Sequence, residues 1–170
     1  MRKDSNTLNV LDLLQSQHTE VDELLERLET QKGDRTAIFQ ELADKLAAHS
    51  SVEEKLFYPT VMNDNTSEML HEAVEEHLAM KRTLADMLDL DPETDEEAFD
   101  AKLAVLKEQV SHHAHDEEEG KLFPILRKSM SEDELLGLGN EVLAMFEELM
   151  KEEPRYNVPD ETDEAAHLPG

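Results

Sequence analysis

The sequence of 170 residues contains no cysteine and no tryptophan, and aromatic residues make up only 4% of it. The absence of cysteine excludes disulfides, iron–sulfur clusters, thiolate zinc sites and cysteine nucleophiles. Any metal would therefore have to be held by nitrogen and oxygen ligands. Glycine and proline are also scarce, with five and six residues. This balance suits long helices built from Ala, Leu, Glu, Lys and Met, and it argues against a sheet protein.

Basic residues are few as well, because 16 Lys and Arg stand against 42 Asp and Glu, giving a formal net charge of −26. Binding to nucleic acid or to an anionic membrane surface depends on Lys and Arg, so this charge opposes both. It is typical of a solvated acidic surface, which would also attract cations. The first six residues lead into no long apolar run. We therefore expect no signal peptide, no membrane span and a cytoplasmic monomer or weak homo-oligomer.

Four long segments repeat apolar residues at spacings of three and four, at about 7–30, 35–61, 68–88 and 95–127. A capping-box pattern at Ser131 and Glu134 opens a shorter fifth helix that ends near Lys151. Since short turns join these segments, we expect an all-α protein whose four long helices run up-down-up-down. Residues 1–152 would form the bundle, and 153–170, with three prolines and many acids, a disordered or loosely attached tail.

Each of the four long segments carries one histidine on its apolar stripe. These are His18, His49, His77 and His113. At a rise of about 1.5 Å per residue, the first three lie at a common level, within about one turn. His113 lies farther along its helix than this count predicts, and we expect the connection before it to absorb the difference.

The strongest motif is an internal repeat. The series Leu42, Leu46, His49, Glu53 recurs with identical spacings as Leu106, Val110, His113, Glu117. Each copy leads to an aromatic–proline end, at Pro59 and at Pro124, and the second copy has one extra residue before its proline. A His and a Glu four residues apart share one helix face. Each pair could therefore bind one metal ion, or its Glu could bridge to a second.

Four imidazoles and two carboxylates would thus converge in an apolar interior, where unpaired polar groups are strongly unfavourable. Two divalent cations bridged by the carboxylates would remove this penalty, as in other two-metal helical bundles. The ligand types do not select the metal, since zinc and manganese also accept nitrogen and oxygen ligands. An acidic bundle without metal is the competing structural interpretation.

Other polar residues near these motifs have weaker signals. His112 and His115 flank the stripe out of phase, which favours surface positions or a role in orienting a ligand. Pairing His115 with Glu119 keeps the spacing of four but loses the apolar phase. His71 follows a glutamate at a ferritin-like spacing that no second pair in the bundle matches. Asp22, one turn after the first stripe histidine, could orient that histidine as an acceptor.

The order of these motifs resembles the hemerythrin-like family, also called the HHE cation-binding domain, over residues 8–150. The matching elements are His18, His49-x-x-x-Glu53, Glu76-His77 and His113-x-x-x-Glu117, with the two aromatic–proline ends. The resemblance implies a four-helix bundle with two iron ions, bridged by two carboxylates and an oxo or hydroxo group. Carried over position by position, the ligands would be His18, His49, Glu53, His77, His113 and Glu117.

The sequence departs from the oxygen-carrying hemerythrins at Ala73, where those proteins have a second histidine one turn before the ligand of the third helix. This argues against reversible oxygen transport. The resemblance then implies a protein that binds or senses O₂ or NO, or that handles iron. A di-iron enzyme that reduces NO or peroxide, or that repairs iron centres, is the alternative. Composition does not separate these two.

Overall fold

The computed structural model describes residues 8–169, and within them the chain forms helices and no strand. The α-helices are α1 (Val10–Glu29), α2 (Arg35–Val52), α3 (Tyr58–Val61), α4 (Ser67–Leu88), α5 (Glu96–Ser111), α6 (Phe123–Ser129) and α7 (Glu132–Lys151). Two π-helical stretches, Glu53–Phe57 and His112–Leu122, join α2 to α3 and α5 to α6, and Pro154–Glu161 is a 3-10 helix. The expected all-α class is confirmed for this part of the chain. The expected start of the first helix at Thr7, and the residues before it, lie outside the described residues.

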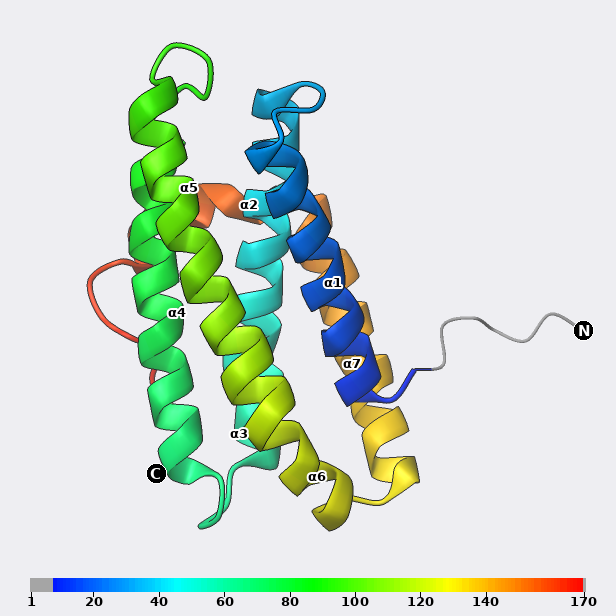
Figure 1. Ribbon diagram of the computed structural model, residues 1–170. Coiled ribbons are helices and arrows are strands. Elements are labelled where there is room, and N and C mark those ends of the chain that lie inside the picture. Colours follow the sequence, from blue (N-terminus) through cyan, green and yellow to red (C-terminus); the bar gives the residue numbers. More distant parts are fainter. Residues whose placement is uncertain (1–7, 170) are drawn as a thin grey trace, which may run out of the picture.

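The long helices lie side by side, as Figure 1 shows. The turn after α1 and the loop after α4 lie at one end of the molecule, and the connection from α3 to α4 lies at the other. Helix α7 packs against α1 and α2. Gly139 allows this close approach, since a Cβ atom there would lie 2.3 Å from the carbonyl oxygen of Leu8. No helix in the described part is long and apolar enough to cross a membrane.

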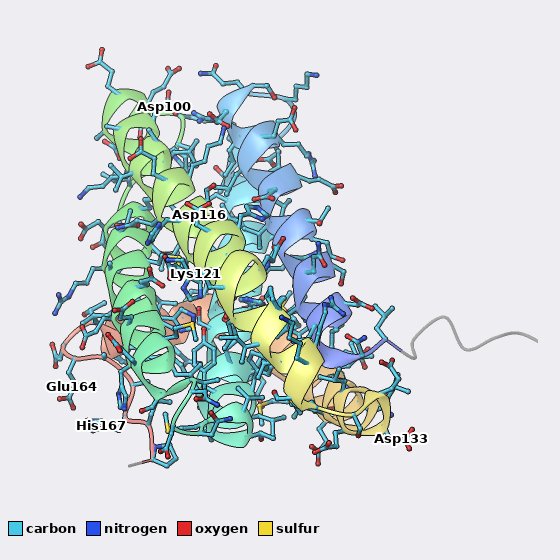
Figure 2. All side chains as sticks on the ribbon, turned by 60° about the horizontal axis from the view of Figure 1, so that its bottom comes forward. Asp100, Asp116, Lys121, Asp133, Glu164 and His167 are labelled. Carbon is cyan, nitrogen blue, oxygen red and sulfur yellow. The ribbon has the colours of Figure 1, made fainter. Side chains whose placement is uncertain are left out.

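Capping side chains define the starts of two helices. The side chain of Asn9 caps α1 by accepting a hydrogen bond from the backbone N–H of Asp12, at 2.9 Å. The capping box expected at Ser131 and Glu134 is present at the start of α7, with both reciprocal bonds formed. Charged side chains cover the outside of the bundle (Figure 2).

The apolar core consists of two clusters, one on each side of a polar layer. One cluster joins the starts of α1 and α4 to α3, α6 and α7 and includes Phe57 and Phe123. The other joins the rest of α1 to α2, α4 and α5 and includes Phe39 and Phe99. The stripe histidines stand between the two clusters in the sequence of every long helix. The polar layer is therefore enclosed by hydrocarbon above and below.

The C-terminal segment differs from the expected loose tail, because residues 154–161 pack across α2 and α4. Val158 is only 1% exposed, and Arg155 is buried beside Asp44, with Nη1 2.8 Å from Oδ2. Composition suggested disorder because the segment contains few apolar residues. A buried valine and ion pairs to two different helices therefore hold this 3-10 helix on the surface.

Candidate metal centre

Four buried histidines meet in the polar layer as two facing pairs. Nε2 of His18 lies 3.2 Å from Nε2 of His49, which joins α1 to α2. Nε2 of His77 lies 3.0 Å from Nε2 of His113, which joins α4 to the second π-helical stretch. The structure thus brings together the four histidines that the sequence placed on the apolar stripes.

Each of these histidines is oriented by a side-chain oxygen from a neighbouring helix. The Nδ1 contacts are His18 to Glu119 at 2.6 Å, His49 to Gln17 at 2.6 Å, His77 to Glu54 at 2.7 Å and His113 to Glu76 at 2.8 Å. Carboxylate and amide oxygens can only accept, so each Nδ1 must carry the hydrogen and donate it. The four Nε2 atoms therefore point their lone pairs inward, as metal-binding imidazoles do.

These four contacts form a closed ring around the bundle, defined by the acceptors Gln17, Glu54, Glu76 and Glu119. The residue before His18 orients His49, and the residue before His77 orients His113. In the same way, the residue after Glu53 orients His77. Two of the acceptors follow the internal repeat, since Glu54 comes directly after Glu53 and Glu119 directly after Glu118, whereas Gln17 is neutral where Glu76 is charged.

Two buried carboxylates lie between the histidine pairs. Oε1 of Glu53 is 3.1 Å from Nε2 of both His49 and His77. Oε1 of Glu118 is 3.1 Å from Nε2 of His18 and 3.6 Å from Nε2 of His113. Among the described residues, Glu53 Oε2 and Glu118 Oε1 find no hydrogen-bond partner. Each carboxylate thus has one oxygen, Oε1, that lies near a histidine of both pairs.

The structure places Glu118, and not Glu117, in this layer. The carboxylate of Glu117 lies 3.0 Å from the ammonium group of Lys121, on the outer side of the helix. The cause is the π-helical stretch His112–Leu122, in which each turn takes about one residue more than an α-helical turn. The residue five positions after His113 therefore returns to the inner face. The α-helical spacing of four, used to select Glu117, does not apply here.

A signal for this register was present in the sequence. Counted back from the proline, Glu53 stands six residues before Pro59, and Glu118 stands six residues before Pro124. The extra residue in the second copy lies between the His and the Glu, where a π-helical turn absorbs it. Aligning the two copies from their proline ends would have selected Glu118.

Tyr58 is a member of the layer that the sequence analysis missed. Its hydroxyl group donates a hydrogen bond to Oε2 of Glu118, at 2.7 Å, and lies 3.3 Å from Nε2 of both His77 and His113. The proline-end alignment pairs Tyr58 with Phe123, so the second copy of the repeat has no equivalent hydroxyl group. A phenol oxygen therefore stands beside one histidine pair only.

A small cavity of about 20 Å³ adjoins the four histidines. Its other lining side chains are mainly apolar and include Val21, Leu46, Met80 and Val110. A cavity of this size holds about one water-sized molecule. The arrangement provides two groups of potential metal ligands, and the ligand atoms within each group all lie within 4.8 Å of one another. The groups are His18, His49, Glu53 and Glu118, and Glu53, His77 and His113.

The sequence matches the description "Hemerythrin HHE cation binding domain" over residues 9–126, which is more than half of the chain. The chain belongs to this hemerythrin family. A DNA nickase of Nostoc sp. (strain PCC 7120 / SAG 25.82 / UTEX 2576) is 28% identical over 134 residues, which cover 77% of this chain. They cover 37% of the nickase, so the chain spans well under half of that relative's length. No solved structure matches the sequence.

In this member of the hemerythrin family, the remaining polar candidates lie outside the two facing pairs. His115 lies 2.7 Å from Asp22 and 3.0 Å from Oε2 of Glu119, so Asp22 contacts His115 rather than His18. Nε2 of His112 lies 3.0 Å from Glu76. His71 lines a surface groove beside α4 together with the C-terminal residues Glu164 and His167, which Figure 2 labels.

The electrostatics of this hemerythrin-type layer favour cations. Burial disfavours a charged His18, but the carboxylates of Glu118 and Glu119 outweigh it and raise the pKa of His18 from 6.5 to about 9. The pKa of His113 is also raised, against burial, by Glu118 and Glu53. For Glu53, burial is again the largest opposing influence, and the neighbouring histidines lower its pKa well below the usual value. The raised pKa values of His18 and His113 favour protonation of these two histidines when no metal is bound.

Proposed function

We propose that this chain holds two metal ions, iron being the expected metal, and binds or senses O₂ or NO or handles iron. In this proposal the helices form an up-down-up-down four-helix bundle. One ion would be held by His18 and His49 and the other by His77 and His113. Glu53 and Glu118 would bridge the two ions, so that Glu118 takes the role first expected of Glu117.

The facing Nε2 atoms are the observation that carries this proposal. With every Nδ1 donating to an acceptor, two lone pairs face each other at 3.2 Å and two more at 3.0 Å. Such pairs repel each other unless a cation lies between them. The unpartnered oxygens of Glu53 and Glu118 supply the negative charge that two cations would need. The choice of iron over zinc or manganese rests on the family.

The bound pair of ions would supply a Lewis-acidic, redox-active centre, and the chain's own residues decide what reaches it. The cavity beside the histidines has room for a small molecule and is mainly apolar on its outer side. Apolar lining suits uncharged diatomic molecules such as O₂ and NO better than it suits ions. This supports binding or sensing as the first function.

An optical spectrum of the protein, loaded anaerobically with ferrous iron, tests the proposal. We expect two iron ions per chain to survive desalting and charge-transfer absorption to appear when oxygen is admitted. Reversal of that absorption on removing oxygen would favour carriage over redox chemistry. Loss of iron on desalting, with no absorption change, would contradict the two-iron centre. The melting temperature would then show whether any metal stabilises the fold.

The enzyme alternative is favoured by Tyr58, because its O–H group is a proton donor inside the layer, 2.7 Å from Glu118. Burial and the carboxylate of Glu118 raise the pKa of Tyr58 well above its usual value, so the phenol stays protonated and would yield its proton only to a strongly basic group, such as a newly reduced oxygen. Reduction of NO or peroxide consumes protons, whereas binding does not. Repeated consumption of either molecule would support the enzyme, and a single stoichiometric reaction would support the sensor.

The variant Tyr58→Phe should keep both metal ions and lose stability. Phe123 at the equivalent position of the repeat shows that a phenyl ring is compatible with this packing. Removing a hydrogen bond to a buried carboxylate should cost about 1–3 kcal/mol in the metal-free protein. Urea unfolding and metal content per chain measure the two effects. Loss of one ion would show instead that the Tyr58 oxygen is itself a ligand of the ion between His77 and His113.

We further propose that the part shared with the Nostoc nickase is a metal-binding part, and that this chain does not bind nucleic acid. The net charge of −26 opposes contact with phosphates. The shared residues cover 37% of the nickase, so the activity in its name can lie elsewhere in that protein.

A further inference from the structure

The 3-10 helix Pro154–Glu161 presents every third residue to the bundle. A 3-10 helix has three residues per turn, so Arg155, Val158 and Glu161 lie on one face. Arg155 and Val158 are buried, and Glu161 contacts Lys81 on α4. The face that contacts the bundle therefore consists of one apolar residue, Val158, with a charged residue one turn before it and another one turn after it.

Both charged residues are anchored to different helices. Asp44 on α2 accepts from the backbone N–H of Arg155 at 3.0 Å and from its guanidinium group at 2.8 Å. Nζ of Lys81 on α4 lies 3.1 Å from Glu161 and 2.9 Å from Glu54. Arg82 adds hydrogen bonds to the backbone carbonyl oxygens of residues 162 and 163, at 2.9 and 3.2 Å. The segment is thus a strap that spans the gap between α2 and α4.

Val158, at the centre of the strap, covers a small gap in the side-chain packing between α2 and α4. A void of about 10 Å³ lies beneath it, lined by Leu46 and Ser50 of α2 and by Met80 of α4. The same three residues also line the cavity that adjoins the histidines. These three shared residues therefore connect the walls of the two voids. An unbranched, flexible methionine is the side chain among these that most readily changes its rotamer.

We infer that Val158 closes a side entrance to the cavity beside the four histidines, between α2 and α4, and that the strap Pro154–Glu161 decides what enters. The entrance admits small, uncharged molecules of the size of O₂ or NO, because Leu46 and Met80 line it and the voids are no larger than one such molecule. The nature of the natural entrant rests on the proposed function. The existence of the entrance does not, because both voids are present without metal.

Xenon binding to the metal-free protein tests the entrance without any metal chemistry. Xenon enters dry apolar cavities and shifts the NMR signals of adjacent methyl groups. In Val158→Ala we expect a severalfold larger xenon-induced shift at the methyl group of Met80 than in the wild type. Val142→Ala is the matched control, because Val142 is an equally buried valine on α7 that lines neither void. Equal responses in the two variants would overturn the inference.

A second variant covers the case in which Val158→Ala does not fold. Asp44→Asn weakens the anchor of Arg155 and leaves the apolar lining unchanged, so the Met80 methyl shift should increase in the same direction. An unchanged shift in this variant would also count against the strap.

The rate at which NO binds to the ferrous protein provides the link to function. We expect severalfold faster binding in Val158→Ala than in Val142→Ala. If xenon enters more readily but no iron is retained, the entrance stands and the proposed function fails. If both variants bind NO at the same rate and respond equally to xenon, the entrance fails and the two-metal centre is unaffected.

Discussion

Glu118→Gln should remove at least one of the two metal ions, whereas Glu117→Gln should leave both in place. The carboxylate of Glu118 is 1% exposed and lies between the two histidine pairs, so an amide there removes a full negative charge from between two cations. Exchanging a residue that merely orients a ligand weakens metal binding about 10–100-fold, and loss of a bridging ligand should weaken it at least as much.

The two variants form a close comparison, because the same substitution is made at neighbouring positions of one π-helical stretch. The Glu117 carboxylate pairs with Lys121, outside the layer, and its loss should affect only a surface ion pair. Metal per chain after desalting, measured by elemental analysis, separates the variants. Loss of metal in Glu117→Gln with full occupancy in Glu118→Gln would mean that the helix is α-helical here when metal is bound.

Metal loading should remove the pH dependence that His18 and His113 give to stability between pH 6.5 and about 9. In the metal-free protein the pKa of His18 is about 9, against 6.5 for an unperturbed histidine side chain, and the pKa of His113 is also raised. Between pH 6.5 and about 9 the folded chain therefore binds more protons than the unfolded chain. Its stability is greatest at or below pH 6.5 and falls as the pH rises through 9. Metal binding displaces these protons, so the stabilisation by metal should grow over the same range.

Melting temperatures recorded from pH 6 to pH 9 measure this difference, since the curve should fall for the chelator-treated protein and stay nearly level for the metal-loaded protein. His18→Gln is the control, because it removes one of the protonated groups and should flatten the curve of the metal-free protein. A metal-free protein that becomes more stable from pH 6.5 to 9 would contradict the assignment. Parallel curves with and without metal would support a structural acidic bundle instead.

Much of the polar layer could be predicted from the helical spacing of hydrophobic residues in the sequence. The four stripe histidines and Glu53 lie where a spacing of three and four places them, because hydrophobic periodicity reports which side of a helix faces the core. Glu118 could not be predicted in this way, because residues 112–122 form a π-helix, in which the number of residues per turn differs from that of an α-helix. A local π-helical turn does not change the hydrophobic pattern of the sequence. Its one sequence signal is the extra residue in the second copy of the repeat.

The orienting residues were harder to predict than the ligands. The sequence allowed Asp22 to orient His18 from within α1 and left this open, and Glu119 of the second π-helical stretch does so instead. A contact between helices depends on how the helices are rotated against one another, and a single sequence does not contain that rotation. The attachment of residues 154–161 was missed for a similar reason, since it depends on where Asp44 and Lys81 face.

The ring of Nδ1 hydrogen bonds makes the alignment of the histidines depend on both halves of the chain. The hairpin of α1 and α2 orients His49 through Gln17, but its own His18 depends on Glu119 from the other half of the chain. The second half likewise orients His113 by itself and needs Glu54 for His77. Neither half presents a complete set of aligned ligands before the two have docked. In the proposed two-metal centre, metal uptake would therefore follow assembly of the two halves, unlike in a small zinc finger, in which the ion directs folding from the start.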